Sequence, residues 1–299
     1  MSKQHEMGIM EFVEKYKDEN SCRDFLFEKR FPNGFICPKC ECCSHGIYAK
    51  RNLYQCSECR YQCSVTAGTV MHKTHIPLNK WFIAMYLLAK DKRGCSAVRL
   101  SKELKISYKS AWFLLKRLQT AMGQRDSEYV LSGIVEVDDT YFGGKKKSGK
   151  RGCGTAKSKV LVAVSKTDEG KPQYLKMQVV KNLKSKTIRL FSTDNIKENS
   201  QIQTDSYHSY RKLSAEKFAH AYEVYDPNSN WLHWLYILIG NAKSFVGGTF
   251  HGLKMKYLQL YLNEFCYRFN RRYFEDSIFV RLAVASIGST PLTLAELKG

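Results

Sequence analysis

The sequence lacks long hydrophobic runs. Its longest apolar stretch, 231–240, is about half as long as the ~20 residues that a membrane-spanning helix needs, and it contains His233. The N-terminus is charged throughout and lacks the apolar core of a secretory signal peptide. These absences argue against a membrane protein and a secreted protein. We therefore expect a cytoplasmic protein without a membrane partner.

Acidic residues are scarce relative to basic ones. The 299 residues include 28 Asp and Glu against 48 Lys and Arg, which gives a net charge of +20. This excess excludes an acidic scaffold and disfavours a neutral small-molecule enzyme, because a broad positive field attracts polyanions, most commonly nucleic acid. Ribosomes and anionic membranes are weaker alternatives. The hydrophobic fraction of 43% is sufficient for folded cores, and the length suggests two or three domains.

Cysteine is abundant, but its pattern does not fit a disulfide scaffold. The count of 11 is odd, and such scaffolds are short secreted chains. Two C-x2-C pairs separated by fifteen residues have the spacing of a structural zinc site, because each short turn directs two thiolates toward one tetrahedral ion. Four buried or redox-active thiols are the alternative. The predicted zinc ribbon spans 31–70, follows an N-terminal helical segment at 1–30, and has as its ligands Cys37, Cys40, Cys56 and Cys59.

A helical segment at 76–125 follows the predicted ribbon. Apolar residues at helical spacing predict helices over 78–90, 97–104 and 108–122, and Ser96 is a candidate helix cap. Two helices joined by a short turn indicate a helix-turn-helix whose second helix faces DNA. A generic helical bundle is the alternative. The side chains that this second helix would offer to DNA are Tyr108, Lys109, Lys116 and Arg117.

Further along the chain, strand patterns replace helical ones, and two of the predicted strands end in an acid. The strand 134–138 ends at Asp138, and the strand 201–205 ends at Asp205. Carboxylates brought together at one sheet edge repel each other unless a cation is present, and hard oxygen ligands suit magnesium or manganese. Two such ions can catalyse phosphoryl transfer. The alternative is that each Asp is a turn or cap residue. The other elements expected in this α/β domain are 160–164, 174–180 and 185–191.

Basic residues cluster in two further places. One is a glycine-rich stretch that indicates either a phosphate-contacting loop or a solvated linker, and it includes Lys145, Lys146 and Lys147. The other is a predicted helix at 253–272. Its apolar side chains would pack on the sheet, while its basic side chains would face the DNA backbone, among them Arg268, Arg271 and Arg272.

Four strings of residues resemble a known family. VEVDDTYFGG, TDSYHSY, NAKSFVGGTFHGL and YLQLYLNEFCYRFNRR look like the transposases of bacterial insertion sequences, of the ISXO2-like group, that join a zinc ribbon to a DDE-type, RNase H-like catalytic domain. The resemblance implies a catalytic domain at 130–275 and a C-terminal tail at 276–299. It matches Asp138 to the first catalytic aspartate and Asp205 to the second, with Asp139 beside the metal ligand.

The third catalytic position departs from the common pattern. Where such enzymes usually carry Glu, the matching segment has Asn241, a neutral oxygen ligand, followed by Lys243 as a possible phosphate contact. Glu264 is a rival third carboxylate. The resemblance implies magnesium- or manganese-dependent cutting at the element's terminal inverted repeats and joining to target DNA, by a homo-oligomer in a synaptic complex. A decayed or domesticated DNA-binding protein, a zinc-ribbon transcription regulator and a purely hydrolytic nuclease are the alternatives.

Overall fold

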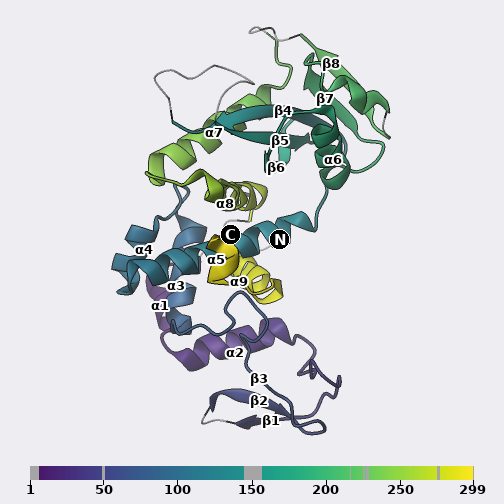
Figure 1. Ribbon diagram of the computed structural model, residues 1–299. Coiled ribbons are helices and arrows are strands. Elements are labelled where there is room, and N and C mark those ends of the chain that lie inside the picture. The colour runs from purple at the N-terminus through teal and green to yellow at the C-terminus, as the bar shows by residue number, and fades with distance from the viewer. Residues whose placement is uncertain are drawn as a thin grey trace. The chain divides into compact units, whose positions relative to one another are not determined.

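A computed structural model describes residues 7–48, 51–144, 157–215, 217–224, 226, 229–274 and 277–298. Its internal contacts divide the chain into two compact units (Figure 1). One unit contains residues 1–125 together with 273–299, and the other contains residues 126–272. The C-terminal segment therefore folds with the N-terminal part of the chain.

Aromatic packing holds the helices of the first unit together. It joins α1 (Ile9–Lys15), α2 (Glu19–Arg30), α3 (Leu78–Lys90) and α9 (Ile278–Gly288). Their ring centroids lie 4.8–5.9 Å apart in a cluster of Phe12, Tyr16, Phe25, Phe82 and Phe279. The expectation of a C-terminal tail at 276–299 is corrected here, because the apolar side of α9 is buried in this cluster and α10 (Leu294–Lys298) follows it.

The cysteine-rich region forms a small antiparallel sheet of β1 (His45–Tyr48), β2 (Leu53–Cys56) and β3 (Gln62–Cys63). The first two strands pair as a hairpin, with Tyr48 opposite Leu53. Its apolar packing comes partly from α2, since the ring of Phe27 stacks on Tyr54 at 4.5 Å. The sheet is too small for a core of its own, so it depends on this helix and on its cysteine cluster.

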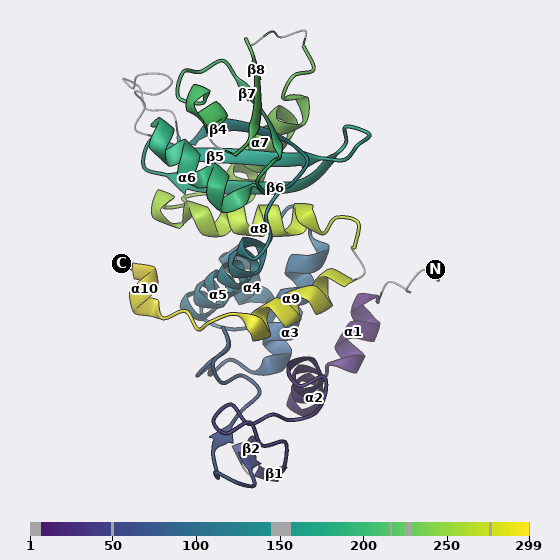
Figure 2. The ribbon, with the colours of Figure 1, turned by 90° about the vertical axis from the view of Figure 1, so that its right-hand side faces the viewer.

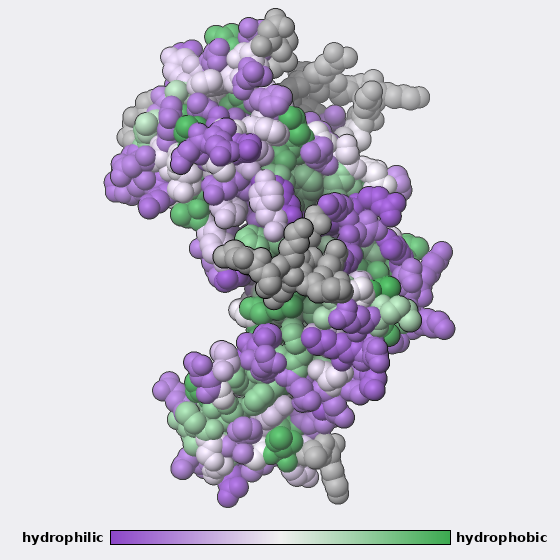
Figure 3. Space-filling model, turned by 180° about the vertical axis from the view of Figure 1, so that it is seen from behind, coloured by the Kyte–Doolittle hydropathy of each residue, from purple (hydrophilic) through white to green (hydrophobic). Residues whose placement is uncertain are grey.

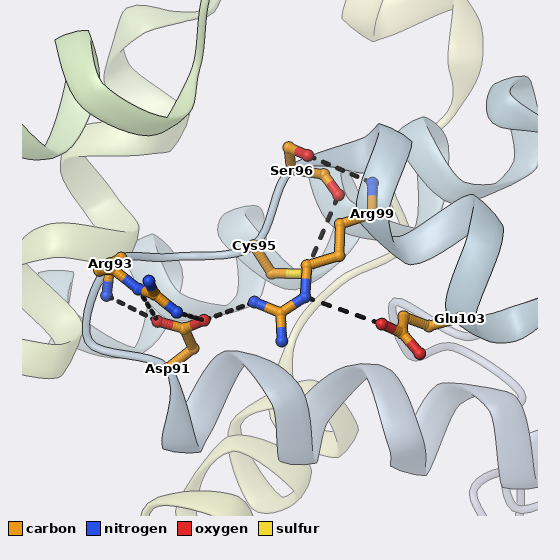
Figure 4. Close-up of polar contacts among 6 residues, drawn as sticks. All are labelled: Asp91, Arg93, Cys95, Ser96, Arg99 and Glu103. Carbon is orange, nitrogen blue, oxygen red and sulfur yellow. Dashed lines mark hydrogen bonds and ion pairs between the residues drawn. The ribbon is translucent and has the colours of Figure 1, made fainter.

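The helices predicted at 97–104 and 108–122 form as α4 (Ala97–Leu104) and α5 (Tyr108–Ser127), and their interpretation as a helix-turn-helix stays a prediction. Ser96 caps α4 by accepting the N–H of Arg99, as expected, whereas Lys105 adopts a left-handed conformation that turns the chain. Before α4, Asp91 binds both Arg93 and Arg99 (Figure 4). Burial opposes ionisation of this carboxyl, but its hydrogen bonds to the two guanidinium groups outweigh burial and lower the pKa of Asp91 to about 2.

The second unit is built on a five-stranded mixed sheet in the order β6-β5-β4-β7-β8. Its central strand is antiparallel to β5 and parallel to β7, while β7 and β8 are parallel. Numbered along the chain, this order is 3-2-1-4-5, the arrangement of an RNase H-like domain, and the fold prediction is confirmed. The strands are β4 (Ile134–Phe142), β5 (Ser158–Lys166), β6 (Pro172–Val180), β7 (Gln201–Asp205) and β8 (Ala219–Glu223).

Helices cover both faces of this sheet (Figures 1 and 2). α7 (His233–Thr249) and α8 (Leu258–Asn270) pack on one face, where they share a core with Phe142 and Val162. α6 (Ser185–Asn195) packs on the other face. Short 3-10 turns, Arg211–Ala215 and Met255–Tyr257, complete the unit.

The surface shown in Figure 3 is largely hydrophilic, with smaller hydrophobic patches between the polar side chains. Within the part of the chain that the structure describes, no helix is both long and apolar enough to cross a membrane.

Candidate active site and metal centre

The four predicted zinc ligands converge. The sulfur atoms of Cys37 and Cys59 lie 3.6 Å apart, and those of Cys40 and Cys56 lie 3.5 Å apart. All four ligand atoms lie within 4.8 Å of one another. Four thiolates about 2.3 Å from a tetrahedral zinc ion would be separated by roughly 3.8 Å, so the donor set and its spacing fit zinc.

The electrostatics of Cys56 also suit a metal ligand. Its burial opposes ionisation, but hydrogen bonds from the Cys59 backbone and the Cys40 thiol outweigh this effect and lower the pKa of Cys56 to about 6. A thiolate near neutral pH is the form that binds zinc. His45 is not part of this cluster, because its ring packs against Phe35 at 4.6 Å.

Asp138 and Asp205 occupy matching positions on neighbouring parallel strands. The register pairs Ile134 with Gln201 and Glu136 with Gln203, and the same offset relates Asp138 to Asp205. Alternation along β4 puts Asp138 on the same face as Glu136 and Phe142, which is the face that α7 and α8 cover. The two carboxylates that the sequence singled out therefore lie on neighbouring strands, with Asp205 at the end of β7 and Asp138 in the middle of β4. The predicted end of this strand at Asp138 is corrected, because β4 continues to Phe142.

Like charges and burial act together on these acids. Burial is the main cause that raises the pKa of Asp138 to about 7, and the negative charges of Asp139 and Asp205 add to it. The Asp139 N–H donates to the Oδ1 of Asp138 at 2.7 Å and partly offsets the shift. Two ionised carboxylates in a buried site repel each other, and a bound divalent cation would stabilise their ionised form.

Tyr210 supports this cluster from the opposite face of the sheet. Its side chain is fully buried, and its hydroxyl donates to the Oδ1 of Asp139 at 3.2 Å. Burial, reinforced by the surrounding carboxylates, raises its pKa well above the ordinary value, so the hydroxyl keeps its proton. The Tyr207 N–H fixes Asp205 by donating to its Oδ1 at 3.0 Å. No pattern in the sequence indicates these roles of Tyr207 and Tyr210.

Helix α7 does not present Asn241 and Lys243 to the same place. Residues two positions apart on an α-helix point about 200° away from each other. Burial and the nearby charge of Lys157 lower the pKa of Lys243, while the charge of Asp138 raises it, which places Lys243 near the carboxylates. Asn241 shares the other flank with Trp234, whose Nε1 donates to the Gly170 carbonyl in the β5–β6 turn. Asn241 and Lys243 therefore do not point to one place, and the assignment of Asn241 as a magnesium ligand stays a prediction.

The flank of Lys243 borders a groove of about 520 Å³. The groove has an apolar wall that includes Phe250, and its polar lining includes Lys157 and His251. Glycines at its edge leave backbone groups accessible, among them Gly143 and Gly144. This arrangement of cationic side chains and open backbone next to Asp138 suits an anionic ligand.

Two other acids can be compared with Asp138 and Asp205. Glu264 is fully buried in α8, which packs against β6, and β5 separates β6 from β4. Glu264 therefore does not reach the end of β7, where Asp205 lies. Glu223 was missed by sequence reasoning, because the edge strand β8 has no apolar pattern to indicate it. It lies in register with Asp205, and its carboxylate accepts the Ser229 hydroxyl at 3.4 Å.

The predicted DNA-contacting residues of α5 separate into two groups. Tyr108 and Lys109 are exposed in its first turn. Lys116 is fully buried, and its Nζ donates to the Oε1 of Gln119 at 2.8 Å. Arg117 is half-buried, with its guanidinium 4.4 Å from the Phe113 ring and its Nε donating to the Leu292 carbonyl. The prediction for Lys116 is wrong in this structure, and Arg117 is engaged in packing.

The arginines at the C-terminal end of α8 and just beyond it are also engaged within their own unit. Arg271 is buried and pairs with Asp126 at 2.7 Å. Arg272 donates to the carbonyls of Pro172 and Gln173, so both arginines bind protein where we expected DNA. Arg268 is half-buried. The predicted contacts Lys145, Lys146 and Lys147 lie outside the described residues.

Comparison with known proteins agrees with this architecture. Residues 130–270 match the family of the ISXO2-like transposase domain, and residues 17–62 match the transposase zinc-ribbon domain, so the ribbon includes α2. An uncharacterised protein in the transposable element ISH50 of Halobacterium salinarum is 25% identical over 229 residues, which is 71% of this chain and 76% of that protein.

Two solved structures are more distant. The Mos1 mariner paired-end complex with Mn is 12% identical, covering 65% of this chain and 78% of that chain with a TM-score of 0.24. The Mos1 transposase paired-end complex with the left transposon end is 11% identical, covering 70% and 79%, with a TM-score of 0.22. The fold assignment therefore follows from the strand order. The chain therefore contains an ISXO2-like transposase domain at 130–270 and a transposase zinc-ribbon domain at 17–62.

Proposed function

We propose that this transposase cuts DNA at the ends of its element and joins the freed ends to target DNA by metal-dependent phosphoryl transfer. The observation that carries the proposal is the shared register of Asp138 and Asp205 on neighbouring parallel strands, with Lys243 beside them. Carboxylates in this position are oxygen ligands for magnesium or manganese.

Asp138 and Asp205 are the residues that would hold the metal. When bound, such ions supply charge stabilisation to the attacking and leaving oxygens of an in-line displacement. Asp138 must lose its proton to act as a ligand, and its raised pKa makes that step sensitive to pH near neutrality. Tyr210 keeps Asp139 in place beside the ligand through its hydroxyl.

Lys243 contributes positive charge on the other side of the reacting group. Its ammonium group, with Lys157 and His251 in the same groove, would bind a DNA phosphate and stabilise the charge that develops on its oxygens. Lys243 lines this groove and also feels the charge of Asp138, so a phosphate held there would be within the field of the lysines and of the carboxylates.

The first unit would select the DNA. The zinc ribbon and the exposed first turn of α5, which carries Tyr108 and Lys109, would bind the terminal inverted repeats. Because joining requires two ends at once, we also propose that the protein acts as a homo-oligomer in a synaptic complex.

The test is strand transfer by the purified chain. The substrate is labelled DNA from the regions that flank its own gene, incubated with Mg²⁺ or Mn²⁺ and a target plasmid. Wild-type protein is expected to produce cut ends and joined products, whereas Asp138→Asn and Asp205→Asn produce neither. Asp194→Asn, the same substitution at an exposed position of α6, is the matched control. Equal product from wild type and Asp138→Asn would refute the enzymatic proposal.

A second candidate is a transposase-derived protein that binds DNA without cutting it. It is favoured by the composition of α7, which contains no acidic residue to serve as a third carboxylate. The same assay separates the two candidates, because this alternative predicts specific binding to the flanking repeats with no metal-dependent product.

A further inference from the structure

Glu136 is a buried carboxylate for which the proposed chemistry has no direct use. Its side chain is 1% exposed, on the same strand and the same face as Asp138. Its Oε1 lies 3.0 Å from the Nζ of Lys166, and its Oε2 accepts the N–H of Leu235 at 3.0 Å. Both carboxylate oxygens therefore have a specific partner, as a charge buried this deeply requires.

The contact with Leu235 fixes the start of α7. The first N–H groups of a helix have no partner within the helix. Leu232, which precedes α7, adopts a left-handed conformation and provides no side-chain cap. Glu136, on the central strand β4, takes the place of the missing cap. Its negative charge interacts favourably with the positive end of the helix dipole.

The same network extends to the strand of Asp205. Lys166 donates from its Nζ to the Oε1 of Gln203 at 2.7 Å, and Gln203 is in register with Glu136. Asp138 and Asp205 each follow two residues further along these strands, on the same face. One buried polar layer thus connects β4, β5, β7 and α7 immediately below the two carboxylates.

We propose that Glu136 is a positioning residue that sets the place of Lys243, carried by α7, relative to Asp138 and Asp205. Glu136 touches neither the DNA nor the metal, and it acts through the helix. This role rests on the phosphoryl transfer proposed above. Without the bond from Glu136, α7 would keep its apolar packing but lose the polar contact that fixes its start against the carboxylate-bearing strand.

The principal variant is Glu136→Gln combined with Lys166→Gln, which leaves no buried charge without its counter-charge. Glu136→Asp is the second variant, because it keeps the charge and shortens the side chain by one methylene. With pre-cut flanking-repeat DNA at saturation, the single-turnover joining rate of both variants is expected to fall about 10–100-fold, the usual effect of residues that orient a metal site. The affinity for the same DNA should not change. Glu198→Gln combined with Lys217→Gln neutralises an exposed ion pair of 2.7 Å and is the matched control.

A double-mutant cycle with Lys243→Ala tests the mechanism. If Glu136 acts by placing Lys243, the Glu136 substitutions slow joining in the wild-type background but cause little further loss in the Lys243→Ala background. The proposal is overturned if the same loss occurs in both backgrounds, or if the melting temperature falls while the joining rate stays at the wild-type value. Failure of the proposed function is distinguishable, because wild type and Asp138→Asn would then give equal product.

Discussion

Asn241 and Lys243 lie two positions apart on α7 and leave the helix in nearly opposite directions, so one of them can face Asp138 while the other cannot. The charge of Asp138 acts on Lys243 and raises its pKa, against the larger effects of burial and of Lys157, which favours Lys243 as the residue on that side. Trp234, on the flank of Asn241, is bonded to the β5–β6 turn. We therefore predict that the helix directs the Lys243 cation toward the carboxylates, with Asn241, which the family resemblance matched to the third ligand, on the other flank.

This geometry predicts different effects for two alanine substitutions. Lys243→Ala should reduce the joining rate by about 10²–10³-fold, because it removes a positive group that stabilises developing charge. Asn241→Ala is expected to leave the rate close to the wild-type value, since its side chain lies on the flank of Trp234, which is bonded to the β5–β6 turn. The measurement is single-turnover strand transfer at saturating DNA. Loss of activity in Asn241→Ala with retention in Lys243→Ala would reverse the assignment of the two flanks.

The raised pKa of Asp138 predicts a pH-dependent response to metal. A group whose pKa is raised by folding contributes stability that is present in acid and is lost as the pH rises through about 7. Metal binding needs the ionised carboxylate, so Mg²⁺ must displace a proton at pH 6 but not at pH 8. The Tm increase caused by Mg²⁺ is therefore expected to be larger at pH 8.

Asp138→Asn provides the control for this pH dependence. The neutral amide resembles the protonated acid, so the variant should melt at a higher temperature than the wild type at pH 8 without metal, and it should lose most of the response to Mg²⁺. Equal Mg²⁺ shifts at pH 6 and pH 8 in the wild type would show that Asp138 does not titrate in this range.

Zinc removal should affect the ribbon and spare the catalytic sheet. Binding of structural zinc by such small modules contributes about 10–16 kcal/mol, which is most of their folding free energy. Cys56→Ser is therefore expected to abolish zinc binding and binding of the flanking repeats. Cys43→Ser, an exposed thiol outside the four-sulfur cluster, is the matched control. Zinc content and DNA affinity are the measurements, and a Cys56→Ser protein that retains both would exclude this site.

Local patterns in the sequence were sufficient for much of this fold. Helices α3 and α4 begin and end where their apolar spacing predicts, and the cysteine spacing alone identified all four converging sulfurs. Asp138 and Asp205 were found because each follows a short run of strand residues, although β4 continues beyond Asp138 to Phe142. In each case the signal lies within a short segment and depends on one period or one spacing.

The missed features depend on contacts between distant segments. Strand β8 is a short edge strand whose residues are mostly polar or exposed, so no alternation marks it. The sequence predicted Arg271 as a DNA contact, because its partner Asp126 lies 145 residues away and no local pattern links the two. Glu136 looked like an ordinary strand residue because its partners, Lys166 and Leu235, come from two other elements.

Lys109 and Lys116 give the sharpest test of how α5 meets DNA. Each phosphate contact contributes to the salt dependence of binding through release of counterions. Lys109 is exposed in the first turn, so Lys109→Ala should weaken binding of the flanking repeats and reduce the slope of log K against log salt by about 1. Lys116 is buried against Gln119, so it cannot contact a DNA phosphate and release the counterions bound there.

The matched substitution is Lys116→Met, which keeps the length and apolar stem of the side chain. It is expected to leave the salt slope at the wild-type value, because the buried ammonium does not contact phosphate in this fold. Its effect should appear in thermal stability alone, and that effect is small if Gln119 finds another partner. Fluorescence anisotropy titrations at several salt concentrations measure both slopes. If Lys116→Met lowers the slope as much as Lys109→Ala does, α5 must rearrange on DNA to expose Lys116, and the burial seen here describes only the DNA-free protein.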